Sequence, residues 1–303
     1  MDMKKNTLNN PLISVIMPVY NAGGFLVEAI ESIVKQTYKN IELIMINDAS
    51  TDDSYSAMLK YKRAYPKVIK IINLAHNLNR GGDSCANLGI KAAEGSFIAK
   101  MDADDIAHPQ RLEKQVKFLL NNPDIFLVGS NAHVIDQHGA IVGEKEEPIT
   151  PEAILKESIY FNPIIHPTVM FRNIPKLKKF YQIKYATAND YFTFFSLQCR
   201  GYKFANLPEK LLFYRIYGQN SSLKNIKKGL ITNLIIKYDI LKKYKYPLTA
   251  KAVFMNILYG LAGLILPQKV NLYLYLISKH IITLDSIKKS LIAPFQKLRL
   301  SIS

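Results

Sequence analysis

The 303-residue sequence contains no tryptophan and only two cysteines. Cys85 and Cys199 lie far apart in the chain and form neither a CxxC pair nor a Cys/His pattern. This cysteine usage favours a reduced, cytoplasmic setting. The polar first residues, MDMKKNTLNNPLIS, show no export signal and lead directly into a strand-like run, which agrees with that expectation.

Two glycine-rich phosphate-binding loops are also missing. No GxGxxG follows the first predicted strand, and no GxxxxGK[ST] occurs in the chain. Dinucleotide-binding proteins and P-loop proteins use these glycines to bring backbone N–H groups against phosphate. The sequence therefore lacks the phosphate cradle of both classes.

Acidic residues are scarce near the C-terminal end. Residues 220–303 contain 14 Lys and Arg but only two acidic residues, which gives +12 of the total net charge of +16. The same segment holds the most apolar run, residues 252–266. A helix of that length spans about 22 Å, short of the roughly 30 Å hydrocarbon core of a bilayer. We therefore expect a basic, apolar helical segment in which residues 252–266 are buried or interfacial.

Short apolar runs alternate with helical patterns over residues 12–130. The runs LISVIMPVY, IELIMIND, VIKIINLA and SFIAKMD are typical of strands, and a helical segment follows each of the first three. Strand and helix alternate repeatedly, which is typical of an α/β fold with a mainly parallel sheet and helices on both faces.

Polar residues follow each of these four strands: PVYNAGG, NDASTDDS, HNLNRGGDS and DADD. The carboxyl ends of parallel strands meet at one edge of the sheet, where ligands bind in open α/β folds. The alternative is that these are ordinary polar loops. In the last stretch, Asp102, Asp104 and Asp105 lie so close that their charges repel, so they either occupy a solvated turn or hold a cation.

The second half of the sequence is less regular. PQRLEKQVKFLLNN and NDYFTFFSLQCRG predict helices, IFLVGSNAHVID and QHGAIVGEKE predict a strand pair, and HPTVMFRN predicts a strand. YKFANLPEKLLFYRIY reads as irregular and partly extended. Residues 220–300 have a helical period with breaks at Pro247, Pro267 and Pro294.

Five motifs, in their order and spacing, resemble those of the inverting family 2 glycosyltransferases with the GT-A fold, of the bacterial surface-polysaccharide type: VIMPVYNA, IMINDASTDDS, NRGGDSCANLGI, AEGSFIAKMDADD and ANDYFTFFSLQCRGYKFANLPEKLLFYR. The resemblance covers about residues 11–218. It implies a Rossmann-like catalytic domain over residues 1–219, with a nucleotide-sugar half at about 11–130 and an acceptor half at about 131–219. Residues 220–303 would form a C-terminal helical extension.

The resemblance gives the acidic stretch a role. Departure of a nucleoside diphosphate develops negative charge, which a divalent cation can neutralise, and Mn²⁺ or Mg²⁺ prefers carboxylate oxygens. Asp102 and Asp104 match the family's DxD motif, so we expect both to bind the metal and the donor. For Asp105 two other roles remain open: capping the helix after Pro109, or pairing with a nearby base.

Donor binding is expected at the other strand ends. The resemblance implies that Pro18, Val19 and Tyr20 flank the nucleotide base and that Asp48 accepts a hydrogen bond from it. A carboxylate acceptor suits the imide N–H of uracil, which favours a UDP-sugar. Arg80 is expected to contact the diphosphate or the base, and its alternative is a simple exposed arginine.

Asp190 matches the aspartate that acts as the catalytic base in the family, taking the proton of the acceptor hydroxyl. Its alternative is a plain N-cap of the predicted helix. Asn189 stands where the family usually has glutamate, which changes the surroundings of Asp190. His166 is expected to border the acceptor side, where it would bind acceptor, phosphate or metal, or serve a structural role. Arg215 and Tyr217 fall where relatives often have a loop that closes over the donor.

The sequence thus predicts a glycosyltransferase that moves a hexosyl or N-acetylhexosaminyl group from a nucleotide sugar to a glycan or lipid-linked acceptor in capsule, O-antigen or lipooligosaccharide biosynthesis. The basic segment 220–303 would attract anionic lipid at the inner face of the membrane, or pack on the catalytic domain with its lysines solvated. Two alternatives are a nucleotidyltransferase on the same fold type and a basic nucleic-acid-binding protein. We expect no nucleic-acid partner, because an acidic cleft repels phosphate unless a metal intervenes.

Overall fold

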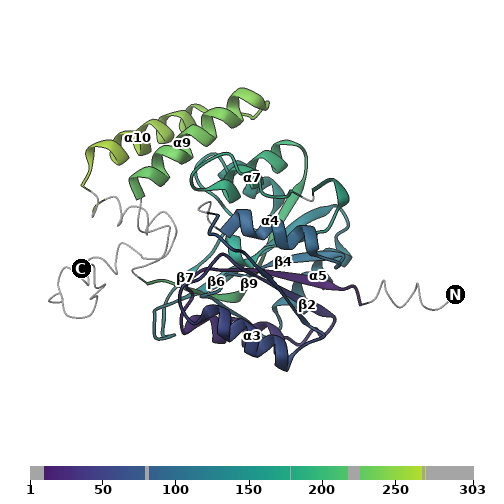
Figure 1. Ribbon diagram of the computed structural model, residues 1–303. Coiled ribbons are helices and arrows are strands. Elements are labelled where there is room, and N and C mark those ends of the chain that lie inside the picture. Colours follow the sequence, from purple (N-terminus) through teal and green to yellow (C-terminus); the bar gives the residue numbers. More distant parts are fainter. Residues whose placement is uncertain (1–9, 79–81, 178, 218–225, 268–269, 271–303) are drawn as a thin grey trace.

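The computed structural model describes residues 10–78, 82–177, 179–217, 226–267 and 270 (Figure 1). Arg80 and the predicted helix break at Pro294 lie outside the described residues. The first half of the described chain alternates strands and helices, as the sequence predicts. Its strands are β1 (Ile13–Val19), β2 (Ile41–Asn47), β3 (Ile69–Asn73) and β4 (Phe97–Lys100).

These four strands form the parallel part of the sheet, in the order β3-β2-β1-β4. β2 and β4 are buried at every position, because helices cover both faces of the sheet. Side chains of β1 divide between the two layers. Ile13, Val15 and Met17 belong to the core on one face, and Ile16 belongs to the core on the other. This burial positions the four carboxyl ends rigidly at one edge.

The remaining strands extend the sheet beyond β4. They are β5 (Ile106–Ala107), β6 (Ile125–Ile135), β7 (Ile141–Lys145), β8 (Met170–Arg172) and β9 (Lys203–Arg215). The order continues as β4-β8-β6-β9-β5, and β7 pairs with β6. β8 is antiparallel to β4 and β6, whereas β9 is parallel to β6. The predicted α/β fold with a mainly parallel sheet is confirmed.

Helices cover both faces of the sheet (Figure 1). α2 (Phe25–Val34), α3 (Ser54–Ala64) and α5 (Arg111–Asn121) share one core, to which they contribute Leu26, Met58 and Leu112. α4 (Gly82–Ala92), α6 (Pro151–Glu157) and α7 (Asn189–Cys199) contribute to the core on the other face. Two 3₁₀ turns, η1 (His166–Thr168) and η2 (Pro175–Leu177), lie between α6 and α7.

Two C-terminal helices, α9 (Ile226–Lys243) and α10 (Ala250–Ile265), pack against α7 and each other. Ile236, Ile240 and Ala252 are buried together with Phe195 of α7. The gap between the helices contains Pro247, where the sequence predicts a break. Within the described ranges, no helix combines the length and the apolar character needed to cross a bilayer.

The structure differs from the prediction in three elements. YKFANLPEKLLFYRIY, predicted as irregular and partly extended, contains the long continuous strand β9, which tolerates Pro208 because its register with β6 shifts there. HPTVMFRN is not one strand, since its first residues form η1 and only Met170–Arg172 pair in the sheet. α6 is absent from the prediction, although Thr150 caps it by accepting a hydrogen bond from Ala153 N at 3.3 Å.

Candidate active site

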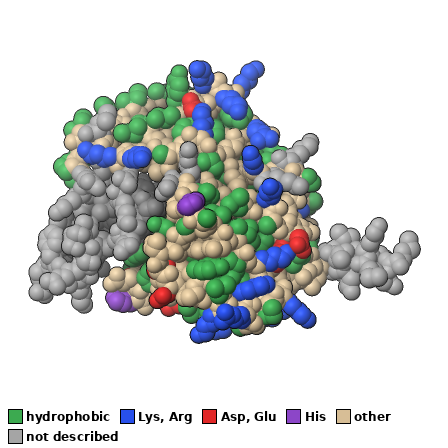
Figure 2. Space-filling view, in the orientation of Figure 1, with side chains coloured by type: hydrophobic (Ala, Val, Ile, Leu, Met, Phe, Trp, Pro, Cys, Tyr) green, Lys and Arg blue, Asp and Glu red, His purple; other side chains and the backbone are tan. Residues whose placement is uncertain are grey.

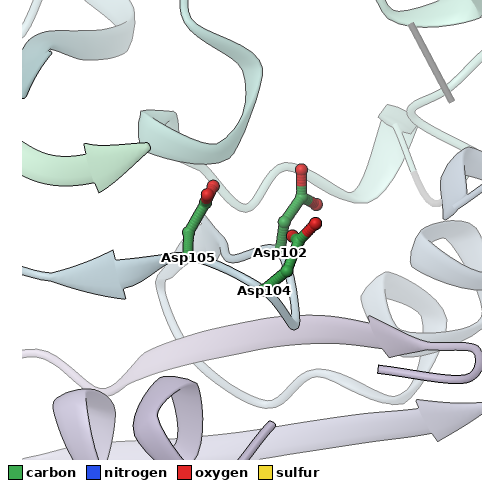
Figure 3. Close-up of side chains that lie close together, drawn as sticks. All are labelled: Asp102, Asp104 and Asp105. Atoms are coloured by element: carbon green, nitrogen blue, oxygen red, sulfur yellow. The ribbon is translucent and has the colours of Figure 1, made fainter. Parts of the chain in front are cut away.

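The acidic turn after β4 brings three carboxylates together (Figure 3). One oxygen from each of Asp102, Asp104 and Asp105 lies within 4.8 Å of the others. Asp102 and Asp104 stand side by side in the close-up, with Asp105 further along the turn. Such a set of oxygen atoms is suited to a hard divalent cation. The spacing in the sequence predicts Asp102 and Asp104 as this pair, and Asp105 joins them in space.

Two buried, positively charged side chains, those of Lys100 and Arg111, lie beside this turn, and the sequence analysis predicted neither of them. The Lys100 ammonium is 2% exposed and forms an ion pair with Asp102 Oδ1. Arg111, fully buried in α5, donates from Nη2 to the Lys100 carbonyl at 2.7 Å. Burial is the largest single influence on the pKa of Asp102 and raises it, but the charges of Lys100, His166 and Arg111 together with the Lys100 hydrogen bond lower the pKa overall. The only signal in the sequence is a lysine inside the apolar run SFIAKMD.

Asp104 and Asp105 are less well compensated. Burial, and then repulsion by Asp102, raises the pKa of Asp104 to about 6. Burial and the two neighbouring carboxylates raise the pKa of Asp105 well above its usual value. Asp105 Oδ2 is buried without a hydrogen-bond partner in the described part of the chain. These uncompensated oxygens fit a cation, because a cation would relieve both their repulsion and the loss of hydration.

Asp105 does not cap the helix after Pro109, since the N-cap of α5 is Gln110. Its Oδ1 instead accepts a hydrogen bond from the backbone N of Arg215 at 2.8 Å. It therefore joins the acidic turn to the end of β9, more than a hundred residues further along the chain.

Arg215 is not part of an exposed loop over the donor. Its side chain is 1% exposed, and its Nε donates to the Asp104 carbonyl at 2.8 Å. The guanidinium also pairs with Glu28 of α2 at 2.5 Å and lies 4.5 Å from the ring centroid of Phe25. Tyr217 follows, and its hydroxyl donates to Asp104 Oδ2 at 3.0 Å. Both residues therefore support the acidic turn directly.

The predicted base-binding residues lie at the ends of β1 and β2. Pro18 and Val19 are in β1, and Tyr20 follows with 55% of its surface exposed. Asp48 is buried, its N–H donates to the Val19 carbonyl at 2.9 Å, and its Oδ1 accepts from Leu78 N at 2.8 Å. The structure thus brings these four residues to one edge, the same edge that carries the acidic turn.

Asp190 lies in the first turn of α7, but it is not the N-cap. Ala188 is the N-cap, with a φ of 59°. Asp190 Oδ2 accepts a hydrogen bond from Asn162 Nδ2 at 3.0 Å. The side chain of Asn189 contacts a different segment: its Oδ1 accepts a hydrogen bond from the backbone N of Lys184 at 3.0 Å, which stabilises the preceding loop. The capping alternative for Asp190 is therefore wrong, and its carboxylate is held by an amide.

The ring of His166 lies beside Asp83, a carboxylate that the sequence analysis did not identify as a candidate site residue. Its Nε2 is 2.7 Å from the Tyr181 hydroxyl and 3.6 Å from Asp83 Oδ1, at the start of α4. Burial is the largest cause that raises the pKa of Asp83 to about 6. The charge of His166 opposes the rise and that of Asp190 adds to it. His166 is not part of the three-carboxylate group found among the described residues.

A mainly parallel sheet flanked by helices, with an acidic turn at its carboxyl edge, is the arrangement of the GT-A fold. A family model described as glycosyl transferase family 2 matches residues 14–207. The chain therefore belongs to glycosyl transferase family 2. This membership favours glycosyl transfer over nucleotidyl transfer and nucleic-acid binding.

Two relatives extend the similarity over most of the chain. An uncharacterized glycosyltransferase of Haemophilus influenzae is 36% identical over 252 residues, which is 77% of this chain and 77% of the relative. An uncharacterized glycosyltransferase of Methanocaldococcus jannaschii is 36% identical over 225 residues, covering 73% of this chain and 76% of the relative.

Solved structures support the fold. S. aureus TarS in complex with UDP superposes with a TM-score of 0.61 and 17% identity, over 91% of this chain and 77% of that one. The mannosyltransferase PcManGT from Pyrobaculum calidifontis, in complex with GDP-Man and Mn²⁺, gives a TM-score of 0.59 and 17% identity, over 93% and 79% of the two chains.

Proposed function

We propose that this glycosyltransferase is metal-dependent and inverting, and that it moves one sugar from a nucleotide-sugar donor to a hydroxyl group. The observation that carries the proposal is the convergence of Asp102, Asp104 and Asp105 at the carboxyl edge of the sheet. Their charges influence the same space as Asp190, since both Asp102 and Asp190 raise the pKa of Asp83. We therefore assign the acidic turn and Asp190 to one reaction, as metal site and general base.

Asp102 and Asp104 would hold Mn²⁺ or Mg²⁺, which when bound neutralises the charge of the departing diphosphate. Arg215 and Tyr217 keep Asp104 in position through its carbonyl and its Oδ2. Lys100 holds Asp102 ionised through their ion pair. These contacts preorganise the carboxylates before the donor arrives, so binding does not have to order them.

Asp190 would take the proton from the acceptor hydroxyl as that oxygen attacks the anomeric carbon from the face opposite the diphosphate. Asn162 supports this role because its amide donates to Asp190 Oδ2, which fixes the carboxylate while leaving Oδ1 to receive the proton. Attack from the opposite face inverts the anomeric configuration.

A UDP-sugar is the favoured donor. Asp48 at the end of β2 would accept the imide N–H of uracil, and Tyr20 and Pro18 would flank the ring. TarS in complex with UDP supports this choice, whereas PcManGT in complex with GDP-Man and Mn²⁺ supports a metal but a different base. The acceptor would be a glycan or lipid-linked sugar in the biosynthesis of a surface polysaccharide such as capsule, O-antigen or lipooligosaccharide.

The test measures nucleotide release from UDP-glucose, UDP-galactose, UDP-N-acetylglucosamine and GDP-mannose, with Mn²⁺, Mg²⁺ or EDTA. Asp104→Ala should abolish metal-dependent donor binding. Asp190→Asn should retain donor binding by calorimetry and lose turnover by about 10²- to 10⁴-fold, the usual contribution of a general base. Asp124→Asn, which removes a carboxylate from an exposed ion pair with Lys203, is the matched control and should behave as wild type.

Two results would contradict the proposal. Normal turnover in Asp190→Asn would assign the base to another residue. Equal donor binding and turnover in EDTA and in Mn²⁺ would remove the metal from the mechanism.

We further propose that residues 220–303 bring the enzyme to an anionic membrane surface, where a lipid-linked acceptor would be found. Four exposed apolar residues lie along one face of α10: Phe254, Ile257, Leu261 and Ile265, with exposures of 65%, 57%, 49% and 75%. Figure 2 shows hydrophobic side chains gathered at the top of the molecule, where α9 and α10 lie, with basic side chains beside them. Apolar side chains flanked by lysines bind anionic interfaces.

Sedimentation with vesicles tests this surface. Phe254→Ser with Ile265→Ser should weaken binding to vesicles containing phosphatidylglycerol by roughly tenfold or more, because each buried side chain contributes about 1.5 to 3 kcal/mol. Ile141→Ser, at a 57% exposed position in β7, is the matched control. Unchanged binding of the double variant would exclude α10 as the contact surface.

A further inference from the structure

Asp83 is a largely buried carboxylate near the candidate active site, and the proposed chemistry gives it no role. It lies in the first turn of α4, and its side chain is only 14% exposed. A Cβ added at the neighbouring Gly82 would lie at ordinary contact distance, 3.6 Å, from the Pro18 Cβ. The start of α4 therefore lies beside the strand end proposed to hold the nucleotide.

The position of Asp83 is fixed from the acceptor half of the chain. Asn87, one turn further along α4, donates to the Tyr181 carbonyl at 2.8 Å and accepts from Tyr181 N at 2.9 Å. The Tyr181 hydroxyl in turn contacts His166 Nε2 at 2.7 Å, and this ring nitrogen is 3.6 Å from Asp83 Oδ1. We call Asp83, Asn87, His166 and Tyr181 the α4 clasp.

Fold stability alone does not account for this carboxylate. Among the described residues, Asp83 forms no salt bridge with Lys or Arg, and the group at ion-pair distance from it is the His166 ring, which is charged only when protonated. A buried carboxylate without a full counter-charge is costly, and such groups concentrate at functional sites. The α4 clasp holds the carboxylate in place without neutralising it.

The chemistry of the transfer indicates what this carboxylate meets. The transferred sugar is bonded through its anomeric carbon to the diphosphate at the acidic turn, and it is attacked from the opposite side, where Asp190 lies. The ring must therefore occupy the space between Asp102 and Asp190. Both of these charges act on Asp83, and His166, which lies 3.6 Å from Asp83 Oδ1, also acts on Asp102. Sugar rings present hydroxyl groups, and carboxylates are strong acceptors for them.

We propose that Asp83, positioned by His166, accepts a hydrogen bond from a hydroxyl group of the transferred sugar and thereby selects the donor sugar. This inference rests on the proposed function, because it requires a nucleotide-sugar donor in this cleft. A buried acceptor that loses its hydroxyl partner is left unpaired, so a site of this kind rejects sugars that lack the hydroxyl.

The experiment separates the sugar from the nucleotide. Binding of UDP, of the preferred UDP-sugar from the panel above, and of its single-deoxy analogues is measured by calorimetry with Mn²⁺. Asp83→Asn should bind UDP within about twofold of wild type and bind the UDP-sugar roughly tenfold or more weakly, as expected for one hydrogen bond to a charged group. Asp53→Asn, at the exposed N-cap of α3, is the matched control and should change neither affinity.

The deoxy analogues identify the hydroxyl. Wild type should lose affinity for one analogue, and Asp83→Asn should lose clearly less with that analogue, since its neutral amide oxygen is a weaker acceptor than the carboxylate. His166→Gln should reduce sugar affinity less than Asp83→Asn, as a positioning residue. Equal ratios of UDP to UDP-sugar affinity in wild type and Asp83→Asn would overturn this inference and leave the proposed function intact. No binding of any nucleotide sugar by wild type would overturn both.

Discussion

Replacing Arg215 by methionine should strongly destabilise the fold, because this side chain joins three parts of the chain. Its guanidinium donates to the carbonyls of Asp104 at 2.8 Å and Asp136 at 3.2 Å, and it pairs with Glu28. Methionine has a similar length but leaves these carbonyls without the charged donor. Hydrogen bonds to charged groups contribute about 1.5 to 3 kcal/mol each, and breaking a buried charge network costs about 3 to 5 kcal/mol. We expect a loss of about 4 kcal/mol.

Urea unfolding monitored by circular dichroism measures this loss directly, and the melting temperature should fall by about 10 °C. Lys203→Met is the matched control on the same strand. Its ion pair with Asp124 is exposed at both ends, so we expect a loss below about 1 kcal/mol. Arg215→Lys should recover only part of the stability, because an ammonium cannot donate in several fixed directions.

The same variant has a functional consequence. Since Arg215 holds the Asp104 carbonyl, its loss should also weaken Mn²⁺-dependent binding of UDP at temperatures where the protein is still folded. A loss of unfolding free energy below about 1 kcal/mol in Arg215→Met would refute the reasoning, as it would mean that the buried guanidinium does not hold the acidic turn.

Two further changes test the sheet and its packing. Burial opposes ionisation of Glu42, but hydrogen bonds, led by that of Lys70, lower its pKa overall. The ionised carboxylate therefore stabilises the fold above about pH 4.5, and this stabilisation is lost as the pH falls further. In urea unfolding between about pH 5 and 3, Glu42→Gln should reduce the dependence of the unfolding free energy on pH. Gly89→Ala should destabilise the fold by about 1 to 3 kcal/mol, because the new Cβ would lie 2.7 Å from Ile16 Cγ2. Gly229→Ala in α9 is the control: its Cβ would meet open space, so it should stabilise the fold slightly. Equal melting temperatures for the two glycine variants would contradict the packing argument.

The parallel half of the fold could be predicted from the sequence because its signals are local. Each strand is a short apolar run, and each is followed by a polar turn, so the alternation alone indicates the topology. The position of Asp102 and Asp104 follows from the same logic, since a residue after a buried parallel strand lies at the ligand-binding edge. This prediction required only the position at which the strand ends and the type of the residues that follow it.

The contacts of these site residues could not be predicted in the same way. Lys100 ends strand β4, but its burial and its ion pair with Asp102 have no signal in the apolar pattern, and Arg215 contacts Asp104 across more than a hundred residues. Asp83 stands within a quoted motif, but its meaning comes from His166, which belongs to another part of the chain. Sequence periodicity carries no information on contacts of this kind. Asp102 and Asp104 could therefore be predicted as candidate site residues, whereas their contacts with positively charged side chains could not.

The interleaving of the sheet limits how this enzyme can be altered. β8, which follows residue 130, hydrogen-bonds to β4, and β5, which precedes it, hydrogen-bonds to β9. A chimera that takes the residues before and after about 130 from different relatives would have to form both strand pairings between sequences that did not evolve together. A fragment ending near residue 130 would end within β6 and expose unpaired strand edges, which favour aggregation. New donor or acceptor preferences are therefore more accessible through single side chains at the carboxyl edge than through exchange of modules.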